Sequence, residues 1–409
     1  MFYSHGLRTI FVFLLSAAGT IEAAPPEDRV TRLAGMPPVV NSNDIYSETR
    51  AGMLSPVVKA FPARIYVPNT VSNTVTVIDP NTFRVIDRFR VGRQPQHVTP
   101  SYDLKTLWIL NDLSDSLTKI DPATGKKMET VPVKDPYNMY YTPDGKYAIV
   151  VAERVRRLDF RDPESMKLVD SVVVPCRGVD HMDFSADGRY LIASCEFSGM
   201  LVKVDVERHV VLGTLSLPLD QQTGTSSQST AATKKSGSRF SGTRVHHGGG
   251  RMPVEAARMP QDVKTSPDGK LFYVADMMAD GVHVIDGDKL AIVDFISTGR
   301  GAHGLYVSRD SRLLYCSNRD EGTISVISFD QRKAVAKWTI PGGGSPDMGG
   351  VSADGKVLWL SGRYHREVYA IDTADGHLLA RIPVGTGPHG LCVYPQPGRY
   401  SLGHTGTFR

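Results

Sequence analysis

Seven polar side chains stand at matching or nearly matching points of a repeated phrase in this chain. They are His97, Asn138, His181, Asp262, His303, Asp347 and His389. Imidazole nitrogens and ionised carboxylate oxygens offer lone pairs, so side chains of these types that converge on one place can bind a divalent cation or an anionic ligand. The sequence therefore predicts a metal site, with a divalent metal as its cofactor, made of His97, His181, Asp262, His303 and His389.

The same positions also have a structural interpretation. A histidine at the entrance of an inner strand can hydrogen-bond the backbone of a neighbouring strand in a half-buried place. This role is the commonest for such residues; ligand or metal binding comes next, and catalysis last.

Two arginines could bind an anionic ligand near these positions. The guanidinium groups of Arg319 and Arg363 can hold a carboxylate or phosphate in a bidentate fork. With Asn138 and Asp347 they form the predicted ligand-binding set. The adjacent pair His246 and His247 precedes three glycines and lacks the pre-organised geometry that metal binding favours.

The elements that must position these residues are short strands in a repeat of about forty residues, the kind of period that marks stacked supersecondary units. The phrase YTPDGKYAIVVA at Tyr141 returns as FSADGRYLIASC at Phe184, TSPDGKLFYVAD at Thr265, VSRDSRLLYCSN at Val307 and VSADGKVLWLSG at Val351. Apolar and polar residues alternate within each phrase, and an Asp-Gly step suits a tight hairpin because glycine accepts positive φ. Each repeat is predicted to form four strands.

The number of repeats predicts seven blades. Six complete copies start near Pro95, Pro136, Val179, Pro260, Ala302 and Pro346. The seventh is split, because residues 64–91 lack a first strand and residues 388–395, PHGLCVYP, supply one. Pairing the two ends would close an all-β ring and remove its exposed sheet edges.

The phrases IYVPNTVSNTVTVID at Ile65 and FYVADMMADGVHVID at Phe272 resemble the YVTN repeats of the YncE-like β-propeller family. The resemblance covers about residues 60–400 and implies an extracytoplasmic seven-bladed β-propeller around a central channel. Related propellers include the haem-binding domain of a nitrite reductase, the heavy subunit of amine dehydrogenases and a lactonase family. Because one fold hosts many functions, the resemblance implies little about chemistry.

Residues outside the repeats indicate export and two less regular segments. Residues 1–23 have the order of a secretory signal peptide, so we expect a periplasmic or secreted protein with no membrane span after cleavage. We expect a flexible, proline-rich leader over 24–60, the propeller over 61–400 and a tail over 401–409. A Ser-, Thr- and Gly-rich insertion over 220–258, between blades four and five, is expected to be disordered.

The four cysteines and the overall charge exclude some classes of protein. Cys176, Cys195, Cys316 and Cys392 lack the spacing of a disulfide scaffold or a zinc ribbon, and we interpret them as small buried hydrophobes. No CxxCH motif is present, which makes haem a less favoured cofactor than a divalent metal. The formal net charge of +4 gives no strong signal for nucleic acid.

Three functions remain open from the sequence. We expect a non-catalytic binding or scaffold protein of the cell envelope, a monomer that offers its channel mouth to another envelope protein or a small ligand. One alternative is a metal-assisted hydrolase such as a lactonase, because a bound cation could activate water. The other is a propeller that binds haem or docks a redox partner.

Overall fold

The first two strands of each repeat are joined by a turn whose side chains explain the recurring Asp-Gly phrase. In the computed structural model, the Thr142 hydroxyl donates to Asp144 Oδ1 at 2.6 Å, and Ser266 donates to Asp268 in the same way. The next glycine, Gly145 or Gly269, has a φ of +72° or +70°. Positive φ without a Cβ clash closes the hairpin, as the sequence predicts.

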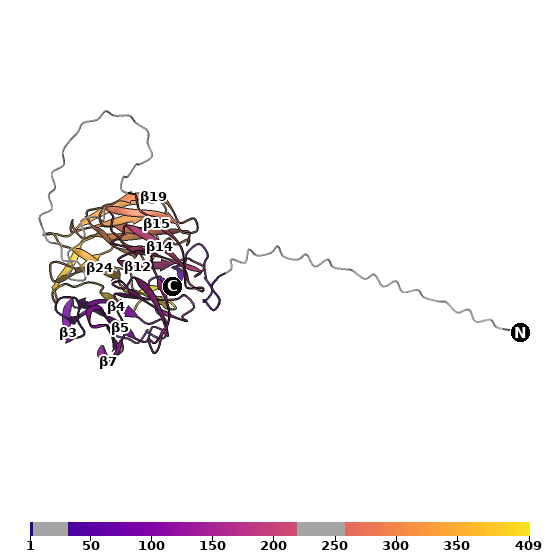
Figure 1. Ribbon diagram of the computed structural model, residues 1–409, viewed down its shortest axis with the longest axis horizontal. Coiled ribbons are helices and arrows are strands. Elements are labelled where there is room, and N and C mark those ends of the chain that lie inside the picture. The colour runs from indigo at the N-terminus through magenta and orange to yellow at the C-terminus, as the bar shows by residue number, and fades with distance from the viewer. Residues whose placement is uncertain (3–31, 219–257) are drawn as a thin grey trace, which may run out of the picture. The chain divides into compact units, whose positions relative to one another are not determined.

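The structure describes residues 1–2, 32–218 and 258–409, and within them the strands form seven antiparallel sheets (Figure 1). The first three sheets contain β28 (Cys392–Tyr394), β1 (Arg64–Asn69), β2 (Thr74–Asp79) and β3 (Arg84–Arg90); β4 (Pro95–Pro100), β5 (Leu107–Asn111), β6 (Ser116–Asp121) and β7 (Lys126–Pro132); and β8 (Asn138–Tyr141), β9 (Ala148–Ala152), β10 (Arg157–Arg161) and β11 (Leu168–Val173), extended by β29 (Ser401–Gly403) and β30 (Thr407–Phe408).

The other four sheets have the same plan. They contain β12 (Val179–Phe184), β13 (Tyr190–Cys195), β14 (Met200–Asp205) and β15 (Val210–Ser216); β16 (Pro260–Thr265), β17 (Leu271–Asp276), β18 (Gly281–Asp286) and β19 (Ala291–Ser297); β20 (Ala302–Val307), β21 (Leu313–Asn318), β22 (Thr323–Ser328) and β23 (Lys333–Thr339); and β24 (Pro346–Val351), β25 (Val357–Gly362), β26 (Glu367–Asp372) and β27 (Leu378–Pro383). Two 3-10 turns, η1 (Ser47–Thr49) and η2 (Asp112–Ser114), complete the described elements.

The seven sheets are the blades of a β-propeller, which confirms the fold class predicted from the repeats. The first strands of most successive blades contact one another, and β12 contacts β9 of the preceding blade, so the blades follow one another around a ring. β28 pairs antiparallel with β1, in the register Arg64 to Tyr394 and Tyr66 to Cys392. Strands from the two ends of the chain therefore share one blade, and β28 covers the edge that β1 would otherwise leave free.

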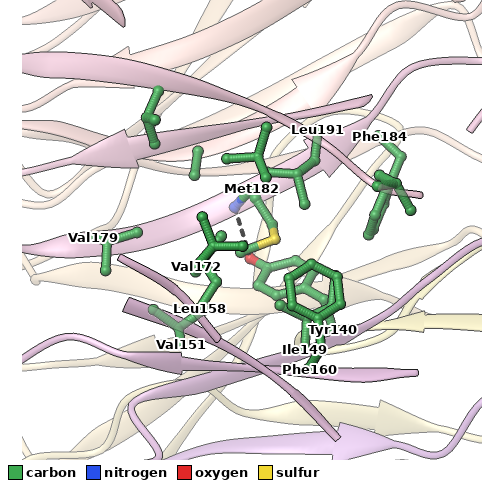
Figure 2. Packing of buried hydrophobic residues seen from close by; sticks show 14 of the residues in the cluster. Tyr140, Ile149, Val151, Leu158, Phe160, Val172, Val179, Met182, Phe184 and Leu191 are labelled. Atoms are coloured by element: carbon green, nitrogen blue, oxygen red, sulfur yellow. Dashed lines mark hydrogen bonds between the residues drawn. The ribbon is translucent and has the colours of Figure 1, made fainter. Parts of the chain in front are cut away.

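Apolar side chains fill the space between neighbouring blades. In one such cluster, Ile149 and Phe160 of the third blade pack with Val179 and Phe184 of the fourth (Figure 2). The backbone N–H of Met182 donates to the Tyr140 hydroxyl at 3.1 Å across this interface. Burial of both faces of each sheet explains why the second strands consist almost entirely of apolar residues.

Residues 32–60, the described part of the predicted leader, are anchored to the ring. The backbone N–H groups of Leu33 and Ile45 donate to the carbonyls of Asp187 and Pro267, each at 2.8 Å. The Tyr46 hydroxyl donates to the Thr265 carbonyl at 2.7 Å. These bonds go to first-to-second strand turns or to the end of an inner strand, so the segment lies along that side of the ring.

Residues 396–409 also leave the position expected for a tail and cross the ring. Ser401 Oγ donates to the Pro100 carbonyl at the end of β4, and Gly403 pairs with Tyr140 of β8. Thr405 Oγ1 donates to the Gly349 carbonyl of β24, on the opposite side of the ring, at 3.1 Å. A segment that bonds inner strands on opposite sides must run across the channel. We call residues 396–409 the crossing segment.

Other sequence predictions fall outside the described residues. They include the signal peptide beyond residue 2, the leader up to residue 31, the insertion up to residue 257, and the His246–His247 pair. Within the described ranges, no helix has the length and apolar character needed to cross a bilayer.

A disulfide joins Cys176 and Cys195, which corrects our interpretation of these two residues as small buried hydrophobes: both are buried, but they are bonded to each other. Cys176 precedes β12, and Cys195 ends β13, the strand that pairs with it. Strand pairing brings the two residues to a Cα–Cα distance of 6.1 Å, although they are 19 positions apart in sequence. Cys316 and Cys392 are buried free thiols, as the sequence predicts.

We expect the double variant Cys176→Ala, Cys195→Ala to be less stable by about 3 kcal/mol, because the bond restricts a loop of this length in the unfolded chain. Urea unfolding monitored by circular dichroism measures the change. A reducing agent should destabilise the wild type by a similar amount and leave the double variant unaffected. Equal stability of the two proteins without reductant would contradict the prediction.

Candidate functional site

A bulge at the start of the inner strands positions the polar residues of the channel. In β4, Pro95 pairs with Asn111 and Val98 pairs with Ile109, so one extra residue is inserted on the β4 side. The same shift occurs in β12, β16, β20 and β24. A bulge interrupts the alternation of a strand and re-aims its side chains, so two consecutive polar residues can be used near the axis.

Two of the side chains so placed, together with one from the crossing segment, bring metal-ligand atoms together. One nitrogen of His181, one nitrogen of His404 and one carboxylate oxygen of Asp262 all lie within 4.8 Å of one another. They come from β12, from the crossing segment just after β29, and from β16. Nε2 of His404 lies 3.7 Å from Oδ1 of Asp262. We call these three residues the histidine–aspartate cluster.

Asn138 links the two imidazoles of this cluster. Its Nδ2 atom lies 3.0 Å from Nδ1 of His181 and 3.0 Å from Nδ1 of His404. An amide NH₂ group has two hydrogens to donate, so it can serve both rings and make both Nδ1 atoms acceptors. Nε2 of His181 then faces Asp180, whose Oδ1 is 3.2 Å away.

Asp262 is held by the backbone and by a lysine. The N–H of Leu305 donates to Oδ2, and the N–H of Val263 donates to Oδ1, both at 2.9 Å. Nζ of Lys264 lies 3.2 Å from Oδ1. A buried carboxylate needs such partners, and here one of them is a cation at the same oxygen that faces His404.

The charges of the cluster suit metal binding at neutral pH. Burial lowers the pKa of both imidazoles, and His404 lowers the pKa of His181 further. Burial acts to raise the pKa of Asp262, but Lys264 and His404 outweigh it and hold this pKa below its ordinary value. The rings are therefore neutral and the carboxylate is ionised, which are the protonation states that bind a cation.

His97 lies beside the cluster with neither ring nitrogen hydrogen-bonded to the described residues. Its ring centroid is 5.4 Å from that of His181, 5.3 Å from that of His404 and 4.8 Å from that of His389. Burial is also the main cause that lowers its pKa. A fully buried imidazole in this state is an exception among polar groups in folded proteins.

The remaining predicted residues gather around Asp347. Oδ2 of Asp347 is 2.8 Å from Nδ1 of His389, and Oδ1 is 3.1 Å from Nδ1 of His303. Nη1 of Arg319 lies 3.1 Å from Oδ1, and Nε of Arg363 lies 3.9 Å from Oδ2. The five predicted metal ligands thus divide into two adjacent groups: His97, His181 and Asp262 near the histidine–aspartate cluster, and His303 and His389 at Asp347.

Both arginines proposed to hold a ligand are already engaged with Asp347, so their role in ligand binding stays a prediction. Asn138, which was predicted to bind a ligand with them, lies instead at the histidine–aspartate cluster, between His181 and His404.

The division follows the repeat. Asp347 stands one residue after Pro346, as His303 and His389 do after the matching residues, whereas Asp262 stands two residues after Pro260, as His97 and His181 do in their repeats. Because these two positions nearly match, the sequence predicted all of the residues at one mouth of the channel.

Three buried carboxyl groups, Glu153, Asp180 and Glu196, form an acidic side of the channel. Burial raises the pKa of each, and Glu196 also acts to raise that of the other two. The pKa of Glu196 itself is about 7, and its Oε2 accepts a hydrogen bond from Gln261 Nε2 at 3.1 Å.

Two residues of the site, His404 and Lys264, were not predicted from the sequence. His404 follows the last repeat and shares no period with it, so no pattern indicated that it enters the channel. Lys264 did carry a signal, because it stands two residues after Asp262 in a predicted strand, and side chains two apart share a face.

The fold and the site define a seven-bladed β-propeller with a polar, histidine-lined channel. A sequence model described as YNCE-like beta-propeller matches residues 30–169 and 250–398, which is more than half of the chain. The chain belongs to the YncE-like β-propeller family, as the YVTN phrases predict. No curated protein matches it.

Three solved structures that resemble the chain show the fold alone, because each is below 25% identical to it. Hydrazine synthase of Kuenenia stuttgartiensis has a TM-score of 0.58 and 18% identity, covering 78% of this chain and 98% of that one. A functionally unknown protein from Desulfotomaculum acetoxidans has a TM-score of 0.60 and 13% identity, covering 81% and 98%. The dihydro-heme d1 dehydrogenase NirN in complex with DHE has a TM-score of 0.55 and 16% identity, covering 90% and 82%.

Proposed function

We propose that this chain is an exported, non-catalytic binding protein of the cell envelope whose channel holds a divalent transition-metal ion. The observation that carries the proposal is the convergence of donor atoms from His181, Asp262 and His404 within 4.8 Å. Zinc binds imidazole nitrogen and carboxylate oxygen at about 2.0–2.2 Å, so donors around one ion lie about 3–3.5 Å apart. The 3.7 Å between His404 and Asp262 is close to that spacing.

Loading such an ion requires two local changes. Lys264 must leave Oδ1 of Asp262, since an ammonium and a metal ion cannot share that position. The Asn138 amide must give up at least one imidazole nitrogen. Asp180 beside Nε2 of His181 is a carboxylate that could then orient this ring, as second-shell carboxylates do in metal sites. His97 is the nearest further imidazole.

The burial of the proposed ligands favours a site that binds an ion without catalysing a reaction. His181 and Asp262 are fully buried, and His404 is 1% exposed. A catalytic ion keeps an open coordination position for its substrate, and the crossing segment lies over one side of this channel. No observation specifically favours the hydrolase. The haem alternative has less support, because the imidazoles pack with ring centroids 4.8–5.4 Å apart and leave little space for a porphyrin.

The proposed location rests on two features. A disulfide such as Cys176–Cys195 is typical of proteins in oxidising compartments. The order of charged, apolar and small residues in 1–23 is that of a secretory signal peptide. A periplasmic or secreted location follows if the peptide is cleaved. We further propose that a monomer presents its channel mouth to an envelope protein or small ligand.

The test is metal binding by the protein purified without a histidine tag and stripped with a chelator. We expect one Co²⁺ or Zn²⁺ per chain after gel filtration, measured by elemental mass spectrometry, and a visible Co²⁺ spectrum typical of nitrogen and oxygen ligands. His404→Gln should weaken binding on the order of 100-fold or more, since loss of a second-shell partner alone costs about 10- to 100-fold.

His209→Gln is the matched control, because His209 forms a histidine–aspartate contact with Asp170, 2.8 Å away, outside the channel. It should bind metal as the wild type does. Metal content that is unchanged in a folded His404→Gln variant would contradict the proposed site, and so would a folded wild type that binds neither ion.

A further inference from the structure

A second polar cavity lies beside the channel, and its chemistry differs from that of the histidine–aspartate cluster. It has a volume of about 60 Å³ and is bounded by β20, β24, the crossing segment, and Tyr46 and Thr49 of the leader. Several water molecules or one molecule of a few heavy atoms could fill this volume. The polar side chains that line it include Lys264, Arg309, Gln396 and His404.

Arg309 is a cation without a charged partner in this cavity. Its guanidinium donates to Oε1 of Gln396 at 2.7 Å and to three backbone carbonyls, those of Val351 at 2.8 Å, Ser352 at 3.1 Å and Thr49 at 3.4 Å. All of these acceptors are neutral, and no carboxylate of the described residues lies within ion-pair distance. Burial also lowers the pKa of Arg309 to about 10. The side chain is half-buried, and an anion in the cavity would offset the hydration that its guanidinium has lost.

Gln396 supplies a hydrogen-bond donor that has no acceptor. Because a guanidinium only donates, the amide must present Oε1 to Arg309, and its NH₂ group must point elsewhere. Nε2 of Gln396 has no hydrogen-bond partner among the described residues, although the side chain is only 3% exposed. A buried donor without a protein acceptor is available to a bound water or ligand.

The other polar groups at the cavity add donors and positive charge. Lys264 carries a second cation, and its only ion-pair partner among the described residues is Asp262. Gly350 lines the same cavity, and a Cβ at this position would lie 3.3 Å from Nε2 of Gln396, so the absence of a side chain leaves space beside this donor. Two cations, a free amide donor and one shared carboxylate leave this cavity with an excess of positive charge.

We infer that this cavity binds a small oxyanion through Arg309, Gln396 and Lys264. The chemistry shared by the candidate ligands is two or more negatively charged oxygens on one small centre, as in phosphate, sulfate or a short carboxylate, which guanidinium groups bind well. The cavity adjoins the proposed metal site, because Lys264 and His404 line it and also contact Asp262, so anion binding is tested on the metal-free protein.

The experiment is calorimetric titration of the metal-free full chain with inorganic phosphate, sulfate or acetate, with sodium chloride at equal ionic strength as the blank. We expect one site per chain with a Kd tighter than about 1 mM. Binding of phosphate and sulfate without acetate would assign a tetrahedral anion, and binding of acetate alone would assign a carboxylate. Failure of all three to bind would overturn the inference.

Two variants test the assigned residues. Gln396→Glu places a carboxylate beside Arg309 and should abolish binding of the anion while raising the melting temperature, a pair of effects that misfolding cannot produce. Arg309→Gln should weaken binding at least tenfold. The matched control is Arg64→Gln, because Arg64 also donates to backbone carbonyls, those of Pro122 and Ala123, but lies away from the cavity. Anion binding that persists in Gln396→Glu would also overturn the inference.

Discussion

Replacing Phe408 by alanine is expected to destabilise the protein by about 3–5 kcal/mol, the usual range for removing a buried aromatic ring. Phe408 is 3% exposed and belongs to an apolar cluster with Val58, Tyr66 and Tyr394. That cluster joins the crossing segment to the leader and to the blade that closes the ring. Guanidinium chloride unfolding, followed by circular dichroism, measures the change.

The control for this prediction is Leu212→Ala, since Leu212 lies on an outermost strand and is 45% exposed. Its effect should stay within about 0.5 kcal/mol, as for most surface substitutions. A loss below about 1 kcal/mol in Phe408→Ala would mean that the ring is only loosely packed, and residues 401–409 would again be a tail.

The second large effect is a pH-dependent gain in stability from Glu196→Gln. Burial raises the pKa of Glu196 from 4.5 to about 7, so between these pH values the folded protein keeps a proton that the unfolded chain has released. The stability contributed by this group is therefore complete below pH 4.5 and is lost as the pH rises toward 7. The difference between the two pKa values corresponds to about 3 kcal/mol.

Glutamine has no proton to lose, and its amide oxygen can still accept from Gln261. The variant and the wild type should have similar stability near pH 4.5, and the variant should be more stable by about 3 kcal/mol at pH 8. Urea unfolding at the two pH values measures this. Glu207→Gln serves as the control, because Glu207 is exposed. Its effect on the free energy of unfolding should be small and equal at the two pH values. A Glu196→Gln variant that is less stable at pH 8 would show that the carboxylate is stabilised in the folded state.

The fold could be predicted from the sequence because its signals are local and recur. Each Asp-Gly turn, together with its preceding Ser or Thr, fixes a hairpin by contacts between residues a few positions apart, as Ser266 and Asp268 show. The split repeat predicted the pairing of β1 with β28 for the same reason, since an incomplete unit at each end leaves an unpaired edge.

The candidate site could be predicted only in part, because half of its geometry depends on contacts with no period. His181 and Asp262 occupy repeated positions and were found. His404 enters from a segment outside the repeats, and its place depends on the pairing of Gly403 with Tyr140. The disulfide was missed for a related reason: the proximity of Cys176 and Cys195 follows from strand register, which the positions of the two cysteines do not reveal.

The crossing segment changes how the ring can come apart. In a linear array of repeats, a terminal unit can fray on its own because it contacts only one neighbour. Here the ring is closed twice. The first closure is the pairing of β28 with β1. The second is the set of hydrogen bonds from the crossing segment to β4 and β8 on one side of that blade and to β24 on the other. Loss of the pairing between β28 and β1 therefore does not by itself release a blade. We expect the ring to unfold in one concerted transition and not by opening of a terminal blade.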